Sequence, residues 1–266
     1  MSTLRPLRVG MLTDKAMLEG FLCADRAYHA YAIGDLAEPY FSQSEWWGAR
    51  DGDSVRALVL LFRGLSPPVL FSMGGDAGLI AEITRHIPLP ATAMVLGQSE
   101  HMTVWQSVYH LDRVDMMWRM VLLPAYFSPP VDTVPVRRLD DRHLPQLLEL
   151  YRYEYGNAFA PSQLAQGVFY GIFDDTALVS VAGTHIFAPE YRLAAVGNVL
   201  TAPKYRNRGY GKQVTAAVCA HLLAQGCDTL ALNVMQTNKS AIRVYESLGF
   251  AVHRMFMEGI GSLKNR

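Results

Sequence analysis

The chain has 266 residues, 50% of them hydrophobic and 18% charged, so it can build sizeable cores and is not intrinsically disordered. Its 24 basic residues equal its 24 acidic residues, which argues against a general nucleic-acid binder, because that class carries a marked basic excess. Residues 1–125 hold 10 Lys and Arg against 13 Asp and Glu, and residues 126–266 hold 14 against 11, which fits an anionic ligand in the second half only weakly.

Hydrophobic periodicity divides the first half into helices and strands. Helical segments are expected within residues 14–40. The later elements expected there are strands at 46–50, 54–62 and 69–73, a helix at 76–86, a strand at 92–97, a helix at 103–111 and a strand at 114–123.

A proline-rich connector follows. Residues 122–135 contain four prolines, and proline at that density stops helices and favours extended connections. The sequence therefore predicts two domains, residues 1–124 and residues 134–266.

The second half begins with a predicted strand at 134–139 and a helix at 141–155, which Asp140 or Asp141 opens as N-cap. A helical segment at 161–168, strands at 169–173, 177–187 and 193–201, and a helix ending at Gly226 follow. The last elements are a strand at 229–234, a helix capped by Asn238 that ends at Gly249, and a strand at 251–258.

The two halves share this order of elements with little sequence similarity. A tandem of two similar α/β (α+β) folds is the economical explanation, and separate α/β domains of unrelated topology are the alternative.

Two glycines stand at a strand-to-helix junction in the stretch KYRNRGYGKQV, residues 204–214. The first-turn amides of a helix have no intrahelical acceptor, and glycine lets a phosphate approach them without a Cβ in the way. Arg206, Arg208 and Lys212 would add positive charge. Neither GxxxxGK[ST] nor GxGxxG is present here. The alternative is a glycine-rich turn with solvated arginines.

This loop resembles the Q/R-x-x-G-x-G/A signature of the GNAT superfamily of acyl-CoA-dependent N-acyltransferases, with Arg206, Gly209 and Gly211 at the defining positions. A second hallmark of that superfamily is similar to residues 232–250 and is supplied by Asn238, Ala241, Tyr245, Gly249 and Phe250. The resemblance covers roughly residues 134–256.

The first half has the element order but no RxxGxG, since residues 73–79 carry no basic side chain. It looks like a degenerate copy without a cofactor site. The resemblance thus implies two tandem GNAT-like domains, each a mixed, mostly antiparallel sheet flanked by helices. The tandem arrangement is similar to the glycine N-acyltransferase-like branch.

The resemblance implies acetyl-CoA, or another short acyl-CoA, as cosubstrate. Amides of residues 207–212 would hold its pyrophosphate, and the backbone of residues 199–201 would run beside its pantetheine arm. The cofactor-binding residues implied are Val199, Leu200, Thr201, Arg206, Asn207, Arg208, Gly209, Tyr210, Gly211, Lys212 and Asn238. A purely capping role for Asn238 is the alternative.

By resemblance, Tyr245 is the general acid that returns a proton to the leaving CoA thiolate, and core packing is the alternative. Many members have a glutamate where this chain has Asn233, and an amide cannot take a proton at neutral pH. Asn233 would instead position a water or the amine.

Four ionisable residues remain candidates for a general base, with a solvated or structural role as the alternative for each: Glu154, Asp174, His185 and Glu190. The amine can also arrive already deprotonated. An aromatic run at 151–159 either walls an acceptor pocket or faces the seam between domains.

The expected function is N-acetyl transfer, direct and without a covalent intermediate, to a primary amine of a small molecule or peptide. A non-catalytic acyl-CoA sensor or scaffold is the alternative, followed by a phosphate- or nucleotide-binding protein of another family.

Cys23, Cys219 and Cys227 form no CxxC pair, so neither disulfides nor a metal site is predicted. No signal peptide or apolar run of roughly 18 residues is found, which favours a cytoplasmic protein without membrane or nucleic-acid partners. It is expected to be a monomer or homodimer.

Overall fold

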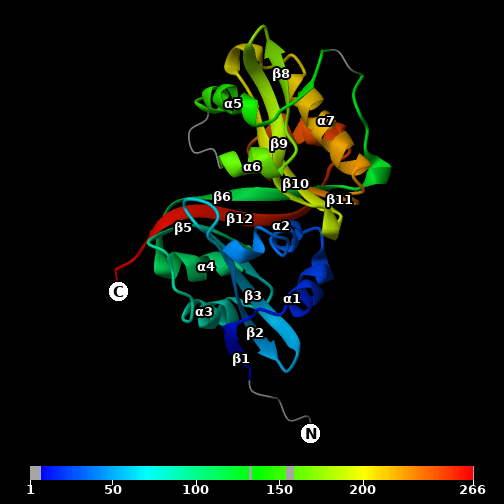
Figure 1. Ribbon diagram of the computed structural model, residues 1–266. Helices are drawn as coiled ribbons and strands as arrows, with labels where there is room; N and C mark the ends of the chain where they lie inside the picture. Colours follow the sequence, from blue (N-terminus) through cyan, green and yellow to red (C-terminus); the bar gives the residue numbers. More distant parts are fainter. Residues whose placement is uncertain (1–6, 132–133, 154–158, 266) are drawn as a thin grey trace. The chain divides into compact units, whose positions relative to one another are not determined.

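A computed structural model describes residues 7–131, 134–153 and 159–265 (Figure 1). The chain forms two compact units. The first comprises Met1–Trp118 and Arg254–Arg266, and the second comprises Arg119–His253. The proposed division into domains at residues 124 and 134 stays a prediction.

The first unit contains both strands and helices. Its elements are β1 (Arg8–Met11), α1 (Lys15–Leu22), α2 (Ala30–Gly34), β2 (Ser44–Asp51), β3 (Ser54–Phe62), β4 (Val69–Met73), α3 (Ala77–Thr84), β5 (Thr92–Gly97), α4 (Ser99–Val108), most of β6 (Tyr109–Leu122) and most of β12 (Ala251–Leu263).

Strands β1 to β5 lie side by side in chain order. Neighbours run antiparallel, except that β4 and β5 run parallel. The strand next to β5 is β12, since residues 257–262 of β12 pair antiparallel with residues 92–97. An apolar core around Val59, Val95 and Trp105 packs α3 and α4 onto this sheet.

The second unit holds the elements that surround the glycine loop. They are β7 (Arg137–Arg138), α5 (Leu144–Tyr151), α6 (Pro161–Gln166), β8 (Tyr170–Asp174), β9 (Ala177–Ala188), β10 (Leu193–Thr201), α7 (Tyr210–Ala224), β11 (Thr229–Met235) and α8 (Lys239–Ser247).

Its sheet repeats that of the first unit. Strands β7 to β10 are antiparallel neighbours in chain order, and β10 and β11 run parallel, with α7 between them in the chain as α3 is between β4 and β5. Figure 1 shows α5 and α6 on one side of β9 and α7 on the other. The predicted fold class, two tandem copies of a mixed, mostly antiparallel sheet flanked by helices, is confirmed.

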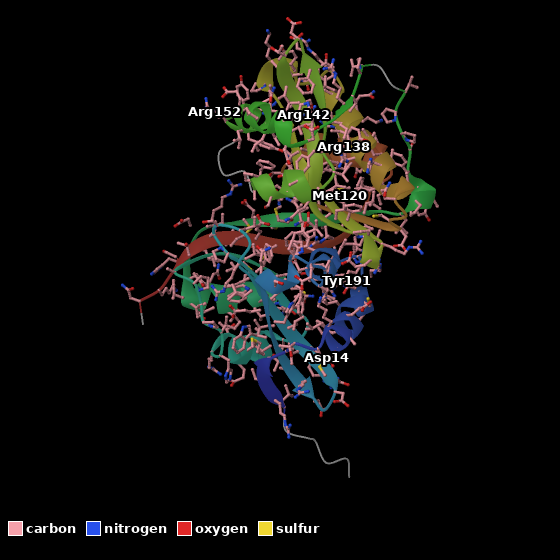
Figure 2. The ribbon with its side chains drawn as sticks, in the orientation of Figure 1. Asp14, Met120, Arg138, Arg142, Arg152 and Tyr191 are labelled. Atoms are coloured by element: carbon pink, nitrogen blue, oxygen red, sulfur yellow. The ribbon has the colours of Figure 1, made fainter. Side chains whose placement is uncertain are left out.

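Several helix starts follow from capping residues that the sequence displays. Asp14 accepts hydrogen bonds from the amides of Ala16 and Met17 at the start of α1, where Figure 2 labels it. Asp140 caps the short 3₁₀ turn Asp141–His143 that precedes α5, as predicted for this position. These side chains satisfy amides that a helix cannot pair by itself.

Two predicted elements differ from their expected bounds. The helix expected at 103–111 ends at Val108, because Tyr109 is buried in the core and donates its hydroxyl to the carbonyl of Pro90 as the first residue of β6. The strand expected at 134–139 is only Arg137–Arg138. Pro135 has no N–H with which to extend that ladder.

Candidate functional site

Strands β10 and β11 pair only at their starts. Residues 193–195 pair with 229–231, although β10 continues to Thr201 and β11 to Met235. On its other side β10 shifts register against β9 twice, and Asn198 takes a left-handed conformation with φ 53°. This bulge turns the end of β10, so its backbone beyond Ala195 is available to an extended ligand on the β11 side.

The loop after β10 leads directly into α7. Arg206 Nε donates to the carbonyl of Thr201 at 3.1 Å, which ties the loop to the end of the strand. Gly209, with φ 79°, is the N-cap of α7, and no side chain caps this helix. The first amides of α7 therefore keep their hydrogen-bonding capacity for a ligand.

The two glycines leave these amides uncovered. A Cβ on Gly209 would meet no atom within 4 Å, and one on Gly211 would meet only Thr201 Oγ1, at 3.5 Å. The Arg208 guanidinium lies 5.3 Å from the centre of the Tyr205 ring, which stacks on Tyr210. Open amides flanked by cations form a cradle that suits phosphate.

The equivalent helix of the first unit, α3, has a closed N-terminus. Asp76 Oδ1 accepts a hydrogen bond from the Leu79 amide at 2.9 Å. A Cβ on Gly75 would lie 2.8 Å from Ala57 Cβ, so no space is left beside that turn. A carboxylate at this position repels phosphate, whereas the α7 position attracts it.

Asn238 is the N-cap of α8, as predicted. Its Oδ1 accepts hydrogen bonds from the Ala241 amide at 3.1 Å and from the Ser240 hydroxyl at 3.0 Å. The oxygen is therefore committed to the helix, and the amide nitrogen is the group that could reach a cofactor.

Tyr245 lies on the apolar face of α8 and is only 8% exposed. Its ring packs edge to face on Phe250, with the ring centres 6.0 Å apart. The helix ends at Ser247, and Gly249 follows it, where a Cβ would lie 1.9 Å from the carbonyl oxygen of Tyr126. Packing therefore fixes where the Tyr245 ring lies, and it accommodates both the core role and the acid role.

Asn233 lies on β11, two residues beyond the last pair with β10. Its Oδ1 is buried and has no hydrogen-bond partner among the described residues. A buried amide oxygen without a donor is costly, so this atom is suited to a ligand or a water.

The other candidate bases differ in their surroundings. Burial lowers the pKa of His185 to about 4, so the ring is neutral at neutral pH. Asp174 accepts the Tyr205 hydroxyl at 2.5 Å, which raises the pKa of that phenol. Glu190 is exposed in the 3₁₀ turn before β10, away from the loop that follows this strand. Glu154 lies outside the described residues.

Part of the aromatic run belongs to the core. Tyr151 and Phe159 pack with their ring centres 5.0 Å apart, and Tyr151 donates its hydroxyl to the Asn198 carbonyl at 2.7 Å. Tyr153 is exposed beside Arg152, which Figure 2 labels at the end of α5. Residues 154–158 lie outside the described residues.

The cysteines of this unit are poor nucleophiles. Burial raises the pKa of Cys219 well above its ordinary value and that of Cys227 to about 11, so both thiols stay protonated at neutral pH. Over residues 7–131, 134–153 and 159–265, no cluster of three or more His, Cys, Asp or Glu could hold a metal. In the same ranges, no helix has the length and apolar character needed to span a bilayer.

Comparison with known proteins gives this site a context. Residues 135–250 match the family model described as the acetyltransferase (GNAT) family. A mycothiol acetyltransferase from Streptomyces avermitilis is 51% identical over 45 residues, which cover 17% of this chain and only 15% of that protein.

Solved structures match nearly the whole chain at low sequence identity. A Drosophila protein has a TM-score of 0.73 at 13% identity, covering 97% of this chain and 99% of its own. A GCN5-related N-acetyltransferase from Sphaerobacter thermophilus has a TM-score of 0.62 at 13% identity, with coverage of 97% and 96%. A tandem GNAT protein from the clavulanic acid biosynthesis pathway has a TM-score of 0.58 at 13% identity, with coverage of 98% and 100%. These likenesses establish a shared fold.

Proposed function

We propose that this chain transfers the acetyl group of acetyl-CoA to a primary amine of a small molecule or peptide, because residues 135–250 match the model of the acetyltransferase (GNAT) family. The observation that carries the proposal is the uncapped, open N-terminus of α7 at the end of a strand that has lost its parallel neighbour.

The proposed cofactor site follows β10 into α7. The amides of residues 207–212 hold the pyrophosphate, with Arg206, Arg208 and Lys212 supplying charge. The backbone of residues 199–201 pairs with the pantetheine arm, and Asn238 contributes its amide nitrogen. With the pyrophosphate at the start of α7 and the pantetheine arm along residues 199–201, the thioester would lie next, near the bulge at Asn198.

The proposed chemistry is direct transfer. The amine lone pair attacks the thioester carbonyl carbon, and an amide of β10 stabilises the oxyanion. The C–S bond then breaks, and Tyr245 returns a proton to the leaving thiolate. Buried, protonated Cys219 and Cys227 support a route without an acyl-cysteine. Asn233 positions the amine or a water.

A second candidate is a non-catalytic acyl-CoA sensor. It is favoured by Asn233, which stands where many members of the family have a glutamate and leaves an amide in place of a base. Binding of acetyl-CoA without turnover of any amine would support it. That the tandem arrangement resembles the glycine N-acyltransferase-like branch is likewise a proposal. So is any similarity between the substrate of this chain and that of the mycothiol acetyltransferase.

Thermal unfolding with acetyl-CoA tests the cofactor site, with ADP as a second ligand. Ligand at 100 times Kd should stabilise the wild-type chain by about 2.7 kcal/mol, a shift of several degrees. Gly209→Trp should abolish the shift by filling the cradle. Gly226→Trp is the matched control, because Gly226 also has a positive φ and open space around its Cβ, but follows the other end of α7.

Loss of the shift in Gly209→Trp but not in Gly226→Trp supports the phosphate cradle. No shift with the folded wild-type chain would mean that the loop does not bind acyl-CoA, and the proposed function would be withdrawn. Equal shifts of the unfolding temperature with ADP and with acetyl-CoA would favour a general nucleotide site.

A further inference from the structure

Asn198 holds a side-chain amide whose orientation is fixed. Its Nδ2 donates to Gln163 Oε1 at 3.1 Å and to the Thr184 carbonyl at 3.3 Å. Gln163 Oε1 must itself be the oxygen, since it accepts the backbone amide of Ala160 at 3.1 Å. Turning the Asn198 amide over would set its oxygen against two acceptors, so Oδ1 points away from both.

Asn198 Oδ1 has no hydrogen-bond partner in the described part of the chain, and the residue is only 7% exposed. The strained φ of 53° and the Tyr151 hydroxyl on its carbonyl hold this residue in the bulge of β10. A rigid, buried oxygen lacking a donor is costly for folding alone, and such groups concentrate at functional sites.

Asn233 shares a sheet face with this network. Ala195 pairs with Ala231, so alternation puts Gly197 and Asn233 on the same face. Leu200, on that face after the bulge, packs into the apolar core with residues of α5 and α6. Asn198 bonds to α6 on this side as well. Two buried amide oxygens therefore lie on neighbouring strands where the strands separate.

Strand β6, the neighbour of β11 in the sheet, carries the buried Arg119. The other elements packed around this point offer no ionised group to the described oxygens. From β9, the only titratable group is His185, which is neutral, with Nδ1 3.5 Å from Gln163 Nε2. From α5, Glu149 is exposed and paired with Arg152 at 2.8 Å, and Tyr151 donates to backbone. Helix α6 and strand β11 carry no titratable residue, and α8 contributes the Tyr245 phenol.

We propose that Asn198 Oδ1, assisted by Asn233, accepts a hydrogen bond from the acceptor amine, and that the enzyme selects weakly basic primary amines that are neutral at working pH. The inference rests on the proposed function, because it places the thioester beside this bulge. A site lined by neutral amides desolvates an ammonium ion without compensating its charge, so it favours the free amine.

The bond pattern suits acetyl transfer. One N–H of the neutral amine is donated to Asn198 Oδ1, which leaves the nitrogen lone pair directed away from that oxygen. The new C–N bond forms as the C–S bond breaks, and Tyr245 supplies the proton of the CoA thiol. The extra proton on nitrogen passes to water, from which the Tyr245 phenolate regains its proton. No enzyme carboxylate is needed, because the amine binds already deprotonated.

The test uses two CoA thioethers that need no knowledge of the natural acceptor. S-(2-aminoethyl)-CoA carries a primary amine tethered to sulfur, and S-ethyl-CoA lacks it. By calorimetry on the full chain in alkaline buffer, the tethered amine should bind about tenfold more tightly than S-ethyl-CoA. This preference should shrink as the pH falls and the amine becomes an ammonium ion.

Asn198→Gly should erase the preference and leave the affinity for S-ethyl-CoA unchanged, because glycine accepts the positive φ. Asp175→Gly, at another positive φ in the β8–β9 hairpin, controls for the backbone change. Asn233→Asp should reverse the pH trend, because a carboxylate favours the ammonium form.

Binding of neither thioether to the wild-type chain overturns the proposed function itself. Binding of both with equal affinity overturns the inference and leaves the proposed function intact. A preference for S-(2-aminoethyl)-CoA that grows as the pH falls also overturns the inference, because Asn198 would then serve a cation. An equal loss of affinity for both thioethers in a folded Asn198→Gly overturns it as well, because Asn198 would then serve the pantetheine arm.

Discussion

A phenol in an apolar environment can serve either packing or proton transfer, and Tyr245 meets the packing requirement fully. The two roles are separable, because the hydroxyl can be removed while the ring stays against Phe250. Phenylalanine at this position keeps the shape of the helix face and removes only the hydroxyl group.

Tyr245→Phe should lower kcat for acetyl transfer about 100-fold, the lower end for losing a general acid, without weakening acetyl-CoA binding. Steady-state kinetics with an accepted amine, beside calorimetry with acetyl-CoA, would measure both quantities. Unchanged kcat would assign Tyr245 to the core alone.

Residues whose type and position have one usual structural role could be identified from sequence. Gly209 stands at a helix start, where its missing Cβ opens a cradle, and Asn238 was identifiable as a cap. Asn198 and Gln163 gave no comparable signal. Their network depends on a bulge between β9 and β10, and periodicity along one strand does not report register against another.

Helix α2 ends at an acidic residue, whose charged form is electrostatically unfavourable there. Asp35 is its C-cap, where the carbonyl ends of the helix already carry partial negative charge. Burial raises the pKa of this carboxyl from 3.8 to about 8. Asp35 is therefore protonated in the folded chain at neutral pH and ionised in the unfolded chain.

Since the folded state binds the extra proton, stability should fall as the pH rises from about 4 to about 8. A side-chain amide cannot ionise, so above this pH range Asp35→Asn should have a free energy of unfolding larger than wild type by about a few kcal/mol. In acid the two chains should be equally stable. Unfolding temperatures measured across that range check the trend. Parallel curves for the two chains would mean that Asp35 stays ionised when folded.

Long elements were predictable, and short ones were not. The strand expected at 177–187 is found as Ala177–Ala188, because a long buried run has a clear pattern. The four-residue strand β1 was missed, since it is an edge strand whose place depends on pairing with β2. The boundary at Tyr109 was also missed, because burial in the core overrides the helical pattern there.

The whole chain contains two copies of one topology with unequal ligand chemistry. The N-terminus of α3 carries the Asp76 carboxylate, and that of α7 is open. We therefore expect one acetyl-CoA per chain by calorimetric titration, and none for Gly209→Trp. Two equivalent sites, or one that survives Gly209→Trp, would show that the first unit binds the cofactor.

The last strand of the chain has a consequence for biosynthesis. Residues 257–262 complete the sheet beside β5, and more than half of the chain separates the two partners. During translation, the edge of β5 stays unpaired while every strand of β7–β11 has already emerged from the ribosome. An unpaired edge is prone to association with other chains, so the nascent first unit needs shielding longest although it is made first.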